Sequence, residues 1–145
     1  MSDNGPLSPL TMADVHLPPG WPPGVAPSRT DDWEVTAVEF LLELVPDLRG
    51  HAARRYPVVL AAIARHTVTG AAEGARQGYR TARTELGEAV PPHAVDAALA
   101  AYRDEGRRLV AAARAAELVE RALRGVHRRT PSLFSGRAAG LAVMD

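Results

Sequence analysis

The sequence has no cysteine and no lysine among its 145 residues. Without cysteine, the chain has no disulfide, no thiolate ligand for a metal and no cysteine nucleophile. Its apolar runs are short: residues 58–64 form one of the longest, far below the ~20 residues that a membrane-spanning helix needs. The first residues are acidic and carry proline, with no basic segment before an apolar one, unlike a secretory signal. We therefore expect a cytoplasmic protein that does not enter a membrane.

Known catalytic motifs are absent as well. The chain has no HExxH, no Glu-x-x-His, no GxGxxG, no Walker loop and no GxSxG elbow. We therefore predict no catalytic residue, no metal site, no cofactor and no small-molecule ligand. Glu39 and Glu43 share a helix face. They could form a metal-binding or acid pair, but we favour the interpretation that they belong to a salt-bridged surface. His66 lies in an apolar stretch, which favours an interior or hairpin position over a role as a ligand.

Acidic and basic residues are separated along the chain. Residues 1–47 carry eight acids and one arginine, whereas residues 48–145 carry sixteen arginines and nine acids. Two interpretations are open: the halves neutralise each other within the fold or across an oligomer, which we favour, or an acidic arm precedes a basic body. All the positive charge is arginine, whose guanidinium makes bidentate contacts with carboxylates and phosphates.

The N-terminal third contains a proline-rich segment followed by an apolar helix. Seven of the twelve prolines lie in residues 1–30, so we expect a flexible, extended arm there, with Trp21 docked on its own domain or on a partner. A first helix is predicted from Asp31 to Pro46, with Asp31 and Glu34 at capping-box spacing. Its apolar residues cover most of its circumference, so it is expected to be buried from more than one side.

Two long helices are expected after a short helical turn at residues 47–55. Pro57 suits the first position of a helix that ends near Leu86, and Pro92 opens a helix at residues 93–124. Gly125 is a stop signal for that helix. The short connection predicts an antiparallel pair. The predicted fold is all-α: a long antiparallel helical hairpin over residues 31–125, with the apolar N-terminal helix packed across it, and flexible arms at 1–30 and 126–145.

Three glycines, Gly70, Gly74 and Gly78, interrupt the second helix at intervals of four residues. Each costs roughly 0.5–1 kcal/mol relative to alanine in a helix interior, so they need an explanation. If the hairpin turns near residue 90, Gly74 faces Gly106 and Gly78 faces Tyr102, and the two backbones approach closely. The alternative is a hinge or a ligand groove.

Four arginines repeat every seven residues along the third helix, at Arg107, Arg114, Arg121 and Arg128. This stripe is suited to binding phosphates, although acidic residues one turn away are placed to neutralise part of it.

The first helix also offers a surface. Leu42 and Val45 face away from Val38 and Leu41, and one hairpin does not cover both sides, so one set is expected to stay exposed as an interface. The favoured function is a non-enzymatic protein–protein interaction or adaptor module, whose partner is a second copy in a homodimer or another protein. Nucleic-acid binding through the arginine stripe is the alternative.

The chain carries the segments LPPGWPPGV, DDWEVTAVEFLLELVPDLR and RQGYRTARTEL. In these it resembles small helical proteins of high-GC actinobacteria. The resemblance implies a bacterial cytoplasmic setting and brings no activity, ligand or site residue with it.

Overall fold

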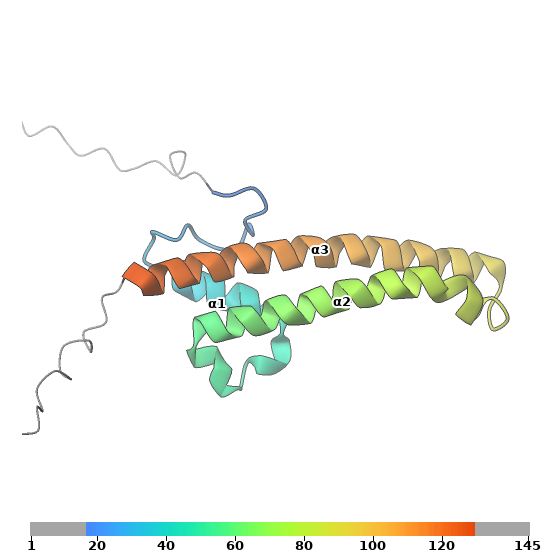
Figure 1. Cartoon of the computed structure of the whole chain (residues 1–145), viewed down its shortest axis with the longest axis horizontal. Helices are drawn as coiled ribbons and strands as arrows, with labels where there is room; N and C mark the ends of the chain where they lie inside the picture. The colour runs from blue at the N-terminus through green and yellow to red at the C-terminus, as the bar shows by residue number, and fades with distance from the viewer. Residues whose placement is uncertain (1–16, 130–145) are drawn as a thin grey trace, which may run out of the picture.

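The computed structural model describes residues 17–129, and every regular element in that range is helical (Figure 1). In chain order the elements are α1 (Trp33–Leu44), the short 3₁₀ helices η2 (Pro46–Leu48) and η3 (Ala52–Arg55), α2 (Pro57–Leu86) and α3 (Pro92–Arg129). The predicted all-α fold with a long hairpin is confirmed. Within residues 17–129, no helix is both long and apolar enough to cross a bilayer.

The helices α2 and α3 form the antiparallel hairpin and lie side by side over most of their length (Figure 1). Pro57 and Pro92 each occupy the first turn, where a missing amide proton is not needed. Helix α3 runs past Gly125 to Arg129, so the predicted stop at Gly125 is wrong. A glycine ends a helix by adopting a left-handed conformation, and Gly20 alone among the described glycines has a positive φ.

Helix α1 lies across the open end of the hairpin, where α2 begins and α3 ends (Figure 1). It starts at Trp33, after Asp32, and no side chain caps it, so the predicted capping box of Asp31 and Glu34 is wrong. A turn occupies the preceding residues, because the Trp33 amide donates to the Thr30 carbonyl at 3.3 Å. The helix therefore begins later than that box requires.

Residues 17–30 form an ordered segment, here called the N-terminal strap, so the predicted flexible arm is wrong for this part of the chain. Three successive turns are closed by bonds from Trp21 to the Pro18 carbonyl (3.0 Å), Val25 to Pro22 (3.1 Å) and Thr30 to Pro27 (3.0 Å). These turns bring Val25 into the core. Residues 1–16 and 130–145 lie outside the described residues, as do the side chains of 126–129.

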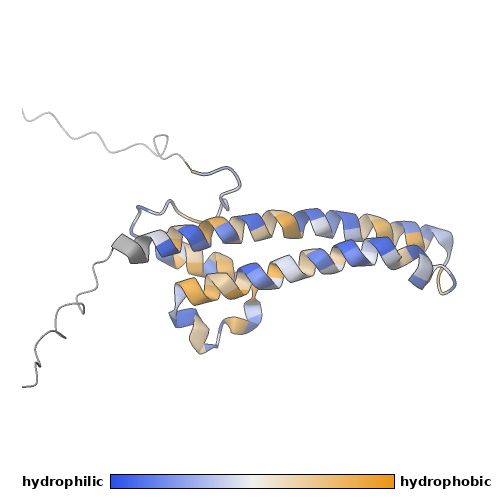
Figure 2. Ribbon diagram, viewed as in Figure 1, coloured by the Kyte–Doolittle hydropathy of each residue, from blue (hydrophilic) through white to orange (hydrophobic). Residues whose placement is uncertain are grey.

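The main hydrophobic core lies at the open end of the hairpin, where α1, the strap, α2 and α3 meet. Figure 2 shows apolar residues gathered on α1 and at the start of α2, while polar residues interrupt the hairpin further along. Leu41, Leu42 and Val45 are buried in this core and Val38 is partly buried, so the prediction that one of the two sets stays exposed is wrong. The strap covers a side of α1 that the two hairpin helices leave open. The buried members of the core are Val25, Trp33, Ala37, Leu41, Leu42, Val45, Leu60, Ala61, Ala64, Ala116, Val119 and Leu123.

Candidate interaction surface

The three glycines of α2 lie in two different environments. A Cβ atom on Gly78 would overlap the Tyr102 ring, which confirms the predicted register of the hairpin at that position. A Cβ on Gly106 would lie 3.8 Å from the Cβ of Ala75, so Gly106 does not face Gly74. Gly70 and Gly74 have no atom within 4 Å of a Cβ placed on them. The predicted close contact between Gly74 and Gly106 is therefore wrong, because α2 turns Gly74 towards solvent.

One side of α2 carries exposed apolar and small residues. We call it the open face of α2, and its members are Val59, Ile63, His66, Gly70 and Gly74, spaced three or four residues apart. Val59 is 48% exposed and Ile63 is partly buried, while His66 and the two glycines are exposed. Of the two positions expected for His66, the interior one is wrong, because the residue lies exposed on the hairpin helix α2. The open face combines large apolar side chains at one end with bare backbone at the other.

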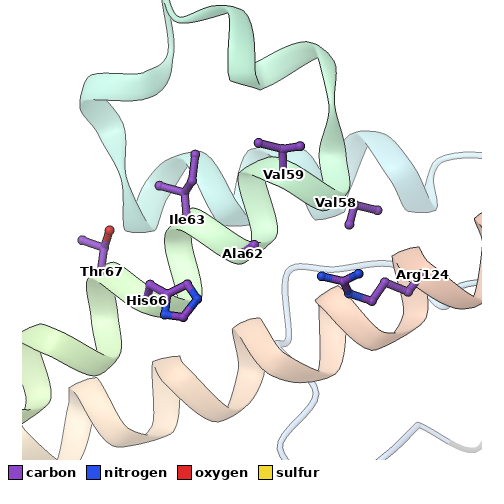
Figure 3. A pocket seen from close by; sticks show the side chains of 7 residues that line it. All are labelled: Val58, Val59, Ala62, Ile63, His66, Thr67 and Arg124. Carbon is purple, nitrogen blue, oxygen red and sulfur yellow. The ribbon is translucent and has the colours of Figure 1, made fainter.

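A groove of about 550 Å³ opens at the apolar end of this face (Figure 3). Successive turns of α2 supply most of its lining, and Arg124 reaches towards it from α3 (Figure 3). The lining is apolar except near its edges, where His66, Thr67 and Arg124 lie. Such a groove suits apolar side chains better than a charged ligand. The lining residues are Val58, Val59, Ala62, Ile63, His66, Thr67 and Arg124.

A cluster of charged side chains joins α2 to α3 beside the groove. Glu120 is only 5% exposed, and it accepts hydrogen bonds from Arg65 Nε at 2.5 Å and from an Arg124 Nη at 2.8 Å. The hydrogen bond from Arg65 lowers the pKa of the Glu120 carboxyl; burial opposes this effect, and Arg124 adds to it. Glu120 is thus an ion held between the helices, and it fixes Arg124 at the edge of the groove.

Among the acidic residues expected to neutralise part of the arginine stripe, the sequence pairs Glu120 with Arg124 at i, i+4 spacing, but it does not identify Arg65 as a second partner. The available signal was Arg65, a charged residue within the apolar first half of α2. In an antiparallel hairpin whose paired positions sum to about 180, Arg65 is level with residue 115, about 7.5 Å along α3 from Glu120. The register therefore puts Glu120 within reach of a long arginine side chain, but it does not give the direction in which each side chain points.

The arginine stripe is partly engaged within the chain. Arg121 pairs with Glu117 at 2.6 Å, and the Arg114 guanidinium lies 3.4 Å from the carbonyl oxygen of Pro19 in the strap. Arg107 is exposed, and no ion pair joins it to another described residue. The side chain of Arg128 lies outside the described part. The four arginines therefore do not form one uniformly available row of positive charge.

The other candidate residues have structural contacts. Trp21 is half-buried and packs on Trp33 with ring centroids 5.8 Å apart, so it docks on its own domain, one of the two positions predicted for it. Its indole N–H donates to the carbonyl of Val25 at 2.9 Å. Glu39 pairs with Arg49 at 3.1 Å and with Arg54 at 3.9 Å, which agrees with a salt-bridged surface. Across residues 17–129, no group of three potential metal ligands comes together.

Comparison with protein-family models, curated proteins and solved structures finds no match.

Proposed function

We propose that this protein is a non-enzymatic helical interaction module that associates with a second copy of itself through the open face of α2. The observation that supports this proposal is the pairing of exposed apolar side chains with solvent-facing glycines on a single helix face. Gly70 and Gly74 lower helix stability, and no contact within the described part of the chain explains them. Close approach by another helix supplies an explanation.

The open face is self-complementary about a two-fold axis. Val59 and Gly74 lie at equal distances along α2 from the midpoint between His66 and Thr67, and Ile63 and Gly70 do so too. An antiparallel pairing of α2 with α2 of the second copy therefore places Val59 over Gly74 and Ile63 over Gly70, twice. The same patch then serves both copies, as a closed dimer requires.

The size of the face sets the expected strength of association. From Val59 to Gly74 the helix rises about 22 Å. A single pair of helices of that length buries less than the ~800 Å² per partner of a standard interface. We therefore expect a weak dimer, populated from micromolar concentration upwards.

Sedimentation equilibrium across a wide concentration range tests this proposal. We expect the average mass to rise from one copy towards two, and Gly74→Gln to move that rise to higher concentration because a long side chain blocks close approach. The same substitution should stabilise the monomer by about 0.5–1 kcal/mol, since glutamine is the better helix former. Thr69→Gln, at an exposed position of α2 that lies off the open face, serves as the control.

Two results would overturn the proposal. One is a mass that stays at a single copy up to millimolar concentration. The other is an association that Gly74→Gln and Thr69→Gln weaken equally, because the open face would then have no special part in it.

Nucleic-acid binding through the arginine stripe stays the alternative prediction. Salt-dependent retention of the protein on immobilised DNA, reduced by Arg107→Gln, would favour it. Arg107 is the appropriate residue because it is exposed, whereas Arg121 already holds Glu117.

A further inference from the structure

A second groove lies between α1 and the N-terminal strap. It has a volume of about 410 Å³, and it shares no lining residue with the groove beside Arg124. Pro22 and Pro23 line it from the strap, and successive turns of α1 line it from Val35 to Glu43. We call it the α1–strap groove.

The wall that α1 supplies is largely apolar. Val35 is 67% exposed, the largest exposed fraction among the large apolar residues that the structure describes. Phe40 lines the same groove and is partly buried. With the two prolines opposite, these side chains make a surface that suits an apolar side chain of a ligand.

The charge of the groove is all of one sign. Glu39 and Glu43 are the only charged residues among its described lining. Glu39 already pairs with two arginines, whereas no ion pair joins Glu43 to another described residue. Glu43 also lies in the last turn of α1, which carries no basic residue. Because the C-terminal end of a helix carries partial negative charge, a cation beside Glu43 would be favoured.

We propose that the α1–strap groove binds an extended basic segment of another protein, with an apolar side chain on Val35 and an arginine beside Glu43. This inference goes beyond the self-association proposed above and does not depend on it, because the open face of α2 and this groove share no residue. From Val35 to Glu43 the helix rises about 12 Å, the length of roughly three to four extended residues. The apolar residue and the arginine of the bound segment therefore lie about three positions apart.

Arginine is the cation that fits this groove best. Its aliphatic stem packs on apolar surface while its charged end stays free to reach a carboxylate, and its guanidinium plane stacks on aromatic rings such as that of Phe40. The guanidinium also forms bidentate hydrogen bonds with a carboxylate such as that of Glu43. The same negative charge disfavours phosphate groups and acidic segments.

An NMR titration tests the proposal with a defined probe, the peptide acetyl-Leu-Ala-Ala-Arg-amide. We expect saturable chemical-shift changes at the backbone amides of Gly24, Val35, Phe40 and Glu43, and much smaller ones along the open face of α2. Replacing the arginine of the peptide with glutamine, or its leucine with serine, should weaken binding several-fold.

Matched variants of the protein separate the groove from general attraction between charges. Glu43→Gln should weaken binding of the peptide several-fold, because it removes the carboxylate that pairs with arginine. Glu34→Gln is the control, since Glu34 is exposed on the same helix and carries the same charge but does not line the groove. Both replaced residues are exposed, so the fold should be retained, and unchanged amide shifts in the core check this.

Three results would overturn the proposal. One is the absence of saturable changes with the peptide. Another is equal weakening by Glu43→Gln and Glu34→Gln, which would mean diffuse attraction to acidic residues. The third is movement of the same four amides when the protein alone is concentrated, which would identify a second copy as the occupant. A protein that stays monomeric still allows this titration, so the two proposals fail separately.

Discussion

At the scale of single residues, the most consequential position is Glu120. It is the one buried acidic residue among those described, and guanidinium groups from two helices hold it. A buried carboxylate without partners would destabilise the fold, whereas a paired one joins α2 to α3 at a defined level. Arg65 keeps 32% of its side chain exposed, so its own desolvation cost is limited.

We predict that Glu120→Gln lowers the free energy of unfolding by about 1–3 kcal/mol at neutral pH, because it removes the acceptor of two charge-assisted hydrogen bonds. Chemical denaturation measures this loss. The control is Glu117→Gln, whose exposed pair with Arg121 should contribute about 0.5 kcal/mol or less. If both variants unfold at the same denaturant concentration, the buried pairs of Glu120 contribute no more to the free energy of unfolding than the exposed pair of Glu117 does.

The same residue predicts a dependence of stability on pH. The pKa of Glu120 is lowered in the folded state, so its ion pairs are fully effective above the unfolded value of ~4.3. Their contribution is lost as the pH falls through the lower folded pKa. Below about pH 4.3, the wild type should therefore lose stability more steeply than Glu120→Gln, and the difference between them should shrink.

At the scale of elements, the helices could be predicted from sequence better than the segments that cover them. Pro57 and Pro92 mark the starts of α2 and α3 correctly, because their effect on the backbone is local. The strap could not be foreseen from proline content, since its order depends on Val25 and Trp21 meeting a helix that lies later in the chain.

The candidate surface was predictable only in part, for a related reason. Spacing shows which residues share a helix face, and it identified Gly70 and Gly74 as a pair. It does not show how that face is rotated about the helix axis towards its neighbour. A small rotation separates Gly78, which meets Tyr102, from Gly74, which meets nothing. The groove depends in addition on Arg124, whose position follows from Glu120.

For the strap, we predict that alanine substitution destabilises it at one of its two glycines and not at the other. Gly20 has φ of +90°, and a Cβ there would lie 2.9 Å from Arg114 Nε, so Gly20→Ala should destabilise the docked strap by roughly 1–2 kcal/mol. Gly24 has nothing within 4 Å of such a Cβ, and Gly24→Ala is its matched control. Hydrogen exchange at the amides of Trp21, Val25 and Ala26 should accelerate in the first variant alone. Unchanged exchange in Gly20→Ala would show that the strap does not depend on this turn.

At the scale of the whole molecule, apolar burial is unevenly distributed along the hairpin. The main core lies at its open end, whereas the turn end relies on a small cluster of Ala82, Val95 and Leu99. Local stability follows the density of buried apolar contacts. The hairpin should therefore resist local unfolding where α1 crosses it and should unfold locally more readily towards the turn.

We predict a matching difference between two leucines. Leu60 is fully buried in the main core, so Leu60→Ala should cost towards the upper end of the roughly 2–5 kcal/mol typical of buried leucines, whereas Leu99→Ala, in the smaller cluster, should cost towards its lower end. Thermal unfolding of the two variants compares them, and native-state hydrogen exchange should show lower protection near the turn. Equal losses in the two variants would contradict an uneven core.

The position of the core also has a kinetic consequence. A helical hairpin closes most easily from its turn, because residues near the turn are already close along the chain. Here the contacts near the turn involve only a small apolar cluster, so they offset little of the conformational entropy that the chain loses. Most of the favourable free energy of apolar burial is gained only when Leu60 and Leu123 come together in the main core at the far end. The folding barrier is then crossed late, with the open end already assembled. In stopped-flow refolding, Leu60→Ala should slow the folding step itself, and a change confined to the unfolding rate would refute this order of events.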